Sequence, residues 1–244
     1  MWILDLFCGG GGASMGMHQA LEEANIKHTI VGIDIRDMPD YPFEFVQADV
    51  FNMGYINFDA FDFFWASPRC QMFTSINNMN KKLNRGSDWI NQIPETRSLL
   101  LQLNKPFVIE NVPKAPLRGD LMLCGTMFNL GVFRHRIFEI HDFVCYQPIH
   151  PKHNGFIGDG KYFQVVRGPM FMNKEFQKKH HDFEKWKEAM GIDWISVPTT
   201  KELPKGHPLA EAIPPAYSKY IMKEFLRKHL TLIDFIEQKV EVCE

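Results

Sequence analysis

The sequence predicts an α/β protein built on a doubly wound, mostly parallel sheet. Three observations support this prediction. Short apolar segments between residues 2 and 112 alternate with helical or polar segments, which is the pattern of strand–helix–strand units. Four glycines, Gly9 to Gly12, join the first apolar segment to the first helical one. Acidic residues end the second and third apolar segments, at the edge where open parallel sheets bind ligands.

Each expected element follows from the spacing of apolar residues and from the residue that interrupts it. Five strands are expected over residues 2–7, 29–35, 45–50, 61–65 and 107–112. Helices are expected over residues 13–24, over residues 95–103 and from Pro214-Pro215 to about residue 237. The polar segment 76–89, rich in Asn and Lys, predicts a long loop or a weak helix.

The pattern changes near residue 140 and divides the chain into three parts. Residues 1–140 carry the alternating segments of the main domain. Residues 141–188 lack clean alternation and contain several glycines and prolines, so they predict a small inserted subdomain. Residues 189–244 are expected to return to the main domain.

Composition narrows the class of protein. Of 244 residues, 45% are hydrophobic and 23% are charged, which is usual for a soluble protein with a full core. The net charge of −2 gives no overall signal for nucleic acid. No apolar run approaches the ~18 residues of a membrane span, and the N-terminus lacks the pattern of a signal peptide. The five cysteines include no Cys-x-x-Cys pair, so we expect a reducing cytoplasm, no disulfide framework, no cysteine zinc site and no metal.

Cys70 follows the point at which the fourth strand must end. Pro68 cannot continue a central strand, so the chain leaves the sheet there and presents a thiol on a loop, between Arg69 and Gln71. A free cysteine is often only a small core residue. Buried cysteines, however, usually lie inside an apolar run rather than after its terminating proline, and this favours a functional thiol.

The glycine segment and two acidic residues together suggest a cofactor that contains adenosine. Asp34 lies 22 residues after Gly12, close to the ~20 expected for a carboxylate that binds ribose hydroxyls. Asp49 ends the third strand, where it can meet an adenine amino group. The segment is neither a Walker loop nor a full dinucleotide fingerprint. Taken singly, each acid is more often a solvated strand end or a helix cap.

Cys70 and Glu110 are the pair that alkylation of a pyrimidine at C5 requires. Attack of a thiolate on C6 makes C5 nucleophilic, and an acid at N3 must neutralise the ring as this happens. Glu110 at the end of the fifth strand can supply that acid, given a pKa raised by burial. A neighbouring cation would help to keep the thiol ionised, and Arg69, Arg134 and Arg136 are the candidates.

These residues resemble the cytosine-C5 DNA methyltransferases, in the order that this family has them and over nearly the whole chain. The matching segments are DLFCGGGG, Asp34, Asp49, SPRCQ around Cys70, Glu110-Asn111-Val112, Arg134-His135-Arg136 and LAEAIPPAY from Leu209 to Tyr217. The combination is highly specific, although no single segment is. The compact size resembles phage-encoded members of the family.

The resemblance implies a Rossmann-like fold, a role for each matching residue and double-stranded DNA as the partner of a monomer. Residues 1–140 would hold catalysis and cofactor, and residues 141–188 would recognise the target sequence. Cys70 would attack C6 of a flipped-out cytosine, with Glu110, Arg134 and Arg136 beside it. S-adenosylmethionine, released as S-adenosylhomocysteine, would contact Phe7, Gly9, Gly11, Asp34, Ile35, Asp49, Val50 and Pro68.

DNA contacts are expected from the residues around and after Cys70 and from the insertion. The residues concerned are Arg69, Gln71, Lys81, Lys82, Arg85 and Arg97, with Asn154 and Arg167 as readers of bases. For each lysine taken singly, a solvated loop explains the charge equally well.

Three departures from the family pattern leave alternatives open. Arg69 replaces the second proline of Pro-Pro-Cys-Gln, Val132 replaces the Gln before Arg-x-Arg, and Pro214-Pro215 replaces the usual Gly-Asn. One alternative is a cytosine-C5 methyltransferase that acts on tRNA, because Cys70-Gln71-x-Phe73-Thr74 resembles that branch of the family. The other is a catalytically inactive DNA-binding regulator, against which the retained Cys70 and Glu110 count.

Overall fold

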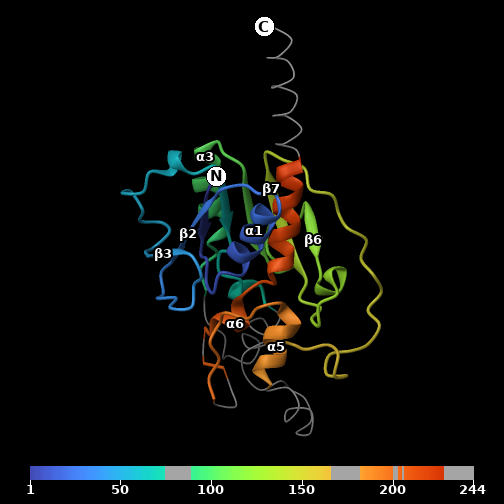
Figure 1. Ribbon diagram of the computed structural model, residues 1–244. Helices are drawn as coiled ribbons and strands as arrows, with labels where there is room; N and C mark the ends of the chain where they lie inside the picture. The colour runs from blue at the N-terminus through green and yellow to red at the C-terminus, as the bar shows by residue number, and fades with distance from the viewer. Residues whose placement is uncertain (75–88, 166–181, 200–202, 205, 228–244) are drawn as a thin grey trace.

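The computed structural model describes residues 1–74, 89–165, 182–199, 203–204 and 206–227 (Figure 1). A seven-stranded sheet runs through its centre in the order β3-β2-β1-β4-β5-β7-β6. The strands are β1 (Trp2–Leu6), β2 (Thr29–Asp34), β3 (Glu44–Gln47), β4 (Phe63–Ala66), β5 (Phe107–Asn111), β6 (Leu121–Leu123) and β7 (Arg136–His141). The first five pair in parallel, while β7 runs antiparallel to β5 and β6. The predicted doubly wound, mostly parallel sheet is confirmed.

Helices cover both faces of the sheet. The helices are α1 (Gly12–Glu23), α3 (Ile93–Leu103), α5 (Phe183–Met190), α6 (Pro208–Glu211) and a further helical segment over residues 215–227. The helix α1 and the segment 215–227 lie side by side on one face, and α3 lies on the other (Figure 1). Three short 3-10 turns are η1 (Phe58–Ala60), η2 (Gln71–Phe73) and η3 (Gly125–Phe128).

The alternation of side chains along each strand builds one hydrophobic core on each face. Ile3, Phe63 and Trp65 pack with Met17 of α1 and Tyr217 on the first face. The neighbouring strand positions, which point the opposite way, pack with Leu100 of α3; they include Leu4, Leu6, Ile33, Phe64 and Ile109. Because the central strands are buried on both faces, their sequences read as continuous apolar runs, and this made them visible in the sequence.

A close contact between two helices explains a glycine inside α1. A side chain at Gly16 would collide with the backbone carbonyl of Pro215 and with Ser218. The segment 215–227 therefore packs directly on α1, beside the glycine segment. A helix from Pro214-Pro215 onward was predicted, and the described residues 215–227 are helical.

The structure differs from the predicted elements in three places. The third strand ends at Gln47 rather than at Val50, because the Asp49 carboxylate accepts a hydrogen bond from the Phe51 N–H and starts a turn. The antiparallel pair β6–β7 was not predicted: β6 has three residues, and β7 carries the charged Glu139 in its buried face. The helix α5 begins in the segment 141–188 and ends at Met190, and no helix was predicted there.

A third hydrophobic cluster lies below the sheet in Figure 1. It joins Val132 near β7 to Trp186 and Met190 of α5, and it includes Ile195 and Leu209 further along the chain. The cluster therefore draws residues from each of the three predicted domains, whose boundaries stay a prediction. Within the described residues, no helix combines the length and apolar character that crossing a membrane requires.

Candidate active site

Four strands end at the same edge of the sheet and bring the predicted residues to one place. The strands β1, β2, β4 and β5 are parallel neighbours, so their carboxyl ends lie together. The Asp34 carboxylate and the Glu110 carboxyl group lie at the ends of β2 and β5. The loops that carry Phe7 and Cys70 follow β1 and β4. The edge includes the β1–β4 border, where the strand order reverses and ligands of such sheets bind.

The glycine segment is a tight turn with one open position. Phe7, Gly9 and Gly11 all have positive φ angles, of 58°, 50° and 79°. A side chain at Gly10, Gly11 or Gly12 would collide with neighbouring protein, such as Pro42 at Gly11 and the Ile213 carbonyl at Gly12. A side chain at Gly9 would meet no atom within 4 Å. Gly9 is thus the glycine beside which a ligand has room.

Asp34 is held in place by backbone and by an arginine. Its Oδ2 accepts a hydrogen bond of 3.1 Å from the Gly9 N–H, and its Oδ1 accepts one of 3.0 Å from the Arg36 N–H. The Arg36 guanidinium lies 3.6 Å from Oδ1 and pairs with Glu211 of α6 at 2.7 Å. Each carboxylate oxygen keeps a second lone pair for a hydroxyl donor. Ile35 follows Asp34 in the chain and has 52% of its surface exposed. An apolar surface therefore lies next to the Asp34 carboxylate.

The other predicted cofactor residues lie in the loops that follow β1, β3 and β4. Asp49 caps the turn to Phe51, Val50 is buried beneath it, and the Phe7 and Phe51 rings meet edge to face with centroids 5.8 Å apart. The Pro68 carbonyl accepts a hydrogen bond from Asn111. The loop after β1, through Phe7, therefore packs against the turn after β3, through Phe51.

Asp5 is a buried acid that the sequence analysis did not single out. The Ser14 hydroxyl donates to its Oδ2 at 2.5 Å, and the Tyr41 hydroxyl lies 2.6 Å from Ser14. Its Oδ1 is buried and has no hydrogen-bond partner among the described residues. Burial raises the pKa of Asp5 to about 7, against the opposing effect of the Ser14 hydrogen bond. Its position inside the apolar run of β1 was the available signal.

These observations fit a cofactor that brings hydroxyls, an apolar ring and a cation. Open space at Gly9, the lone pairs of Asp34 and the bare Ile35 suit an adenosine group. The unpartnered Oδ1 of Asp5 is an acceptor next to the same turn, and it suits an ammonium group. The residues present therefore match the donor and acceptor pattern of S-adenosylmethionine.

The loop that carries Cys70 is fixed to the neighbouring strand. The Asn111 side-chain amide of β5 donates a hydrogen bond of 2.8 Å to the Pro68 carbonyl. Cys70 caps the η2 turn directly afterwards and is partly buried. Burial raises the pKa of its thiol, and Glu110 acts in the same direction, whereas the charges of Arg136 and Arg134 oppose them. The thiol thus lies within the electrostatic reach of the predicted catalytic residues.

Glu110 forms a buried ion pair. Its Oε1 lies 2.9 Å from the Arg136 Nε, and the Ser67 hydroxyl also hydrogen bonds to it. Burial raises the pKa of Glu110, while the Arg136 charge opposes that rise. Ser67 accepts a hydrogen bond of 3.0 Å from the Trp65 indole, which fixes its hydroxyl on the nucleophile loop. Glu110, Arg136 and the start of the Cys70 loop therefore form one connected polar network.

Arg134 joins three parts of the chain. Its guanidinium donates to the Val165 and Ala210 carbonyls at 2.9 and 2.8 Å, and its own carbonyl accepts from the Tyr217 hydroxyl at 2.8 Å. Burial lowers its pKa to about 9, with a further lowering from Arg136. Its Nε has no hydrogen-bond partner among the described residues. The predicted catalytic role of Arg134 remains a prediction, and the structure adds a role in packing.

The predicted DNA contacts are described only in part. The Arg69 guanidinium is exposed and lies over the Trp89 ring, 5.9 Å from its centroid, and the Arg69 N–H is 3.4 Å from the Gln92 side chain. The Gln71 Oε1 is buried with no hydrogen-bond partner in the described part of the chain. Asn154 is described and exposed, whereas Lys81, Lys82, Arg85 and Arg167 lie outside the described residues.

Arg97 corrects one expectation. It was expected to close over DNA together with the preceding loop, but it lies in α3 and pairs with Glu139 of β7 at 2.7 Å. It also donates to the Pro116 carbonyl at 3.0 Å. Glu139 is almost fully buried, so Arg97 supplies the charge that this carboxylate needs. Arg97 therefore joins α3 to the antiparallel end of the sheet.

Comparisons with known proteins support the fold. No model of a known protein family matches this chain, and no curated protein matches it. Among solved structures, a methyltransferase from Entamoeba histolytica, EhMeth, is similar with a TM-score of 0.54 and 13% sequence identity. The similarity covers 93% of this chain and 98% of that chain. The chain therefore has the Rossmann-like α/β fold of a methyltransferase.

Proposed function

We propose that this protein transfers a methyl group from S-adenosylmethionine to C5 of cytosine in double-stranded DNA. The observation that carries the proposal is the network at the carboxyl edge of the sheet. There the Cys70 thiol lies within the fields of Glu110, Arg136 and Arg134, and Asn111 holds its loop. Alkylation at C5 of cytosine requires a thiol nucleophile, a carboxyl group that can donate a proton and a cofactor that supplies the methyl group. The candidate site offers this thiol and carboxyl group, both with a raised pKa, beside residues that fit the cofactor.

The raised pKa of the Cys70 thiol defines the first chemical requirement. In the free protein burial favours the neutral thiol, and Arg136 is the largest opposing influence. A cytosine that enters beside Glu110 takes over part of the interaction that Glu110 makes with Arg136. Arg136 then stabilises the thiolate more fully. The Cys70 sulfur can form a bond to C6 as the C5–C6 electron pair moves into the ring.

Glu110 is the acid that balances this attack. Burial raises its pKa, which favours the protonated form that donates to N3 of the ring as negative charge develops there. Ser67 and Arg136 fix the orientation of its carboxyl group. After methylation the C5 proton passes to solvent water, its electron pair restores the C5–C6 double bond, and the bond between C6 and the Cys70 sulfur breaks with its electron pair returning to sulfur. The Glu110 carboxyl group then takes back the N3 proton.

The cofactor site supplies binding and orientation. S-adenosylmethionine contributes an activated methyl group, and Asp34, Asp49, Ile35 and the loop at Gly9 would hold its adenosine part. Phe7, Gly11, Val50 and Pro68 complete the predicted set around the same turns. Asp5, with its unpartnered oxygen, would accept from the ammonium group. The exposed apolar surface of Ile35 would be covered in the bound state.

Double-stranded DNA is the proposed substrate, and each alternative predicts a different result. A cytosine in a duplex must be flipped out before a protein thiol can reach C6. Arg69 is exposed close after the end of β4, on the same loop as the nucleophile, where a phosphate could approach it. The tRNA reading rests on the Cys70-Gln71-x-Phe73-Thr74 resemblance. The inactive-regulator reading requires that neither nucleic acid is methylated.

A direct transfer assay tests the proposal. The purified chain is incubated with methyl-labelled S-adenosylmethionine and with mixed bacterial DNA, tRNA or both in competition. We expect label in DNA, blocked by Cys70→Ser and unaffected by Cys145→Ser, and bisulfite sequencing then gives the methylated context. Label in tRNA alone would support the RNA alternative. Label in neither, with cofactor binding intact, would support the inactive regulator.

A further inference from the structure

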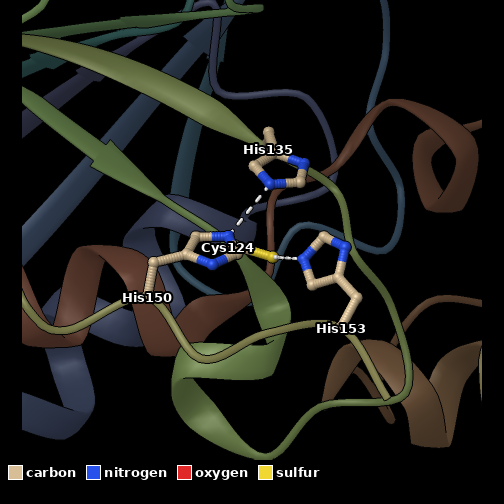
Figure 2. A group of neighbouring side chains, drawn as sticks. All are labelled: Cys124, His135, His150 and His153. Carbon is tan, nitrogen blue, oxygen red and sulfur yellow. Dashed lines mark hydrogen bonds between the residues drawn. The ribbon is translucent and has the colours of Figure 1, made fainter. Parts of the chain in front are cut away.

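Four potential metal ligands converge where the antiparallel strands β6 and β7 meet the carboxyl edge of the sheet. Cys124 follows β6, His135 precedes β7, and His150 and His153 lie in the segment after β7. One ligand atom from each lies within 4.8 Å of those of the other three (Figure 2). Figure 2 shows the Cys124 sulfur pointing toward the His153 ring and the His150 ring pointing toward His135.

We propose that Cys124, His135, His150 and His153 form a tetrahedral zinc site that fastens the segment after β7 to the β6–β7 pair. The proposal concerns the architecture of the chain and does not depend on the proposed methyl transfer. One thiolate and three imidazoles form a closed set of four donors, which is typical of a structural rather than a catalytic zinc ion. Soft sulfur with nitrogen in a tetrahedron also favours zinc over magnesium or calcium.

Two distances between ligand atoms are close to those around a tetrahedral zinc ion, and all of them are below 4.8 Å. Zinc bonds of about 2.0–2.1 Å to nitrogen and about 2.3 Å to sulfur place neighbouring ligand atoms roughly 3.3 to 3.6 Å apart. The two Nε2 atoms of His135 and His150 are 3.1 Å apart, and the Cys124 Sγ lies 3.4 Å from the His153 Nε2. Small movements of these side chains complete the tetrahedron.

The hydrogen bonds around His150 place its ring proton on the nitrogen that faces away from the cluster. Its Nδ1 lies 2.8 Å from the Pro151 carbonyl oxygen, which only accepts, so Nδ1 carries the proton. In the neutral ring, Nε2 is therefore unprotonated and accepts a hydrogen bond from the His135 Nε2, which a metal ion would replace. A carbonyl that fixes the distal nitrogen of a ligand histidine is the usual outer partner in metal sites.

Aromatic stacking orients two of the other rings. The Phe133 ring lies parallel to His153, with centroids 4.0 Å apart and planes at 5°. The His135 and His150 rings are also parallel, with planes at 7°. The Cys124 side chain is fully buried, and its sulfur also contacts the Thr126 hydroxyl at 3.2 Å. These contacts position the donors in advance of binding.

The segment after β7 is the part of the chain that a metal ion would stabilise. Residues 143–154 contain no helix or strand. Gln147 exchanges two hydrogen bonds with the backbone of Met122, and this fixes one point of the segment on β6. A zinc ion would add a second attachment point, at His135 directly before β7. It would also anchor His135, whose carbonyl accepts a hydrogen bond of 2.9 Å from Arg136.

The spacing of the cysteines gives no signal for this site. A Cys-x-x-Cys pair is typical of many zinc sites, and a site with one cysteine and three histidines has no such pair. The histidines are separated by 15 and 3 positions, and the chain folds back before they meet Cys124. The short spacing of His150 and His153 was the only local signal. Binding requires Cys124 as a thiolate, so its proton is released to solvent.

Metal binding by the full-length chain tests the proposal without an activity measurement. The purified protein is stripped with a chelator and titrated with Zn²⁺, and with Co²⁺ as a spectroscopic probe. We expect one equivalent of tightly bound zinc, a higher melting temperature with zinc, and a cobalt spectrum with tetrahedral and thiolate-to-metal bands. His153→Ala, which changes an exposed side chain, should weaken zinc binding more than about 100-fold, because even outer partners contribute about 10- to 100-fold.

Two control variants separate this site from others. Cys124→Ser should abolish the thiolate-to-cobalt band, and Cys145→Ser, at a cysteine outside the group, should leave binding unchanged. His18→Ala tests a smaller group of His18, Glu22 and His28. The proposal is overturned if the wild-type chain binds no zinc. It is also overturned if zinc binding survives His153→Ala and Cys124→Ser but is lost in His18→Ala.

Discussion

The Asn111 side chain donates a hydrogen bond of 2.8 Å to the Pro68 carbonyl, and it thereby ties the nucleophile loop to β5. Its own Oδ1 accepts from the Val112 N–H at 2.9 Å, which fixes the orientation of the amide. Glu110 is the preceding residue of the same strand and pairs with Arg136. The acid and the nucleophile loop are therefore held by two consecutive residues of one strand.

Replacing Asn111 by alanine should reduce turnover more than binding. The Pro68 carbonyl would lose its buried partner, at a cost of about 1–3 kcal/mol, and the Cys70 loop would lose its fixed distance from Glu110. We expect kcat to fall tenfold or more, with cofactor affinity within about twofold of wild type. Asn57→Ala, which removes the cap of η1, is the control. A lower melting temperature with unchanged kcat would show that Asn111 is only structural.

Glu110→Gln tests the acid. Glutamine keeps the size of the side chain but cannot give a proton to N3, so methyl transfer should fall by about 10²–10⁴-fold. Calorimetric titration should show cofactor affinity close to that of wild type, because Glu110 is not among the residues proposed to hold the cofactor. Glu44→Gln, at an exposed residue of β3, should behave as wild type. Turnover unchanged in Glu110→Gln would refute the proposed role.

Arg97→Met should destabilise the protein and leave DNA binding unchanged. Without Arg97, the buried Glu139 loses its main partner, and breaking such a pair costs about 3 kcal/mol or more. Urea unfolding measures this loss, and fluorescence anisotropy measures affinity for DNA. The exposed pair of Arg118 and Asp120 offers a control, since Arg118→Met should have a smaller effect. Weaker DNA binding of Arg97→Met at unchanged stability would support the original expectation that Arg97 contacts DNA.

Asp5 should make the cofactor-free protein less stable as the pH rises. Its pKa is about 7 in the folded state and 3.8 as the ordinary value, so the folded state holds the extra proton between these values. The stabilisation is complete below pH 3.8 and is lost as the pH rises through 7. Between pH 5 and pH 8 the loss is roughly 2 to 3 kcal/mol.

Asp5→Asn isolates that contribution. The amide does not titrate, so the variant should lose less stability than wild type between pH 5 and pH 8. Urea unfolding at both pH values gives the two differences, and Asp62→Asn provides a control at a residue outside this buried group. Equal pH dependence in wild type and Asp5→Asn would contradict the buried, proton-holding carboxyl group.

The sequence predicted the parallel half of the sheet because its strands are buried on both faces. Asp34, Cys70 and Glu110 were found because each stands at the end of an apolar run. The antiparallel half was missed, since β7 has a charged residue whose partner, Arg97, lies 42 positions away. The group around Cys124 was missed for the same reason. Contacts between distant positions leave no periodic signal in one sequence.

The central claim is a covalent bond between Cys70 and C6 of cytosine. DNA containing 5-fluorocytosine tests it most directly, because fluorine at C5 cannot leave as the C5 proton does and the adduct is trapped. The account predicts a denaturation-resistant complex of protein and DNA that forms only with S-adenosylmethionine and is absent in Cys70→Ser. Absence of such a complex with any DNA or RNA, from a chain that binds the cofactor, would contradict it.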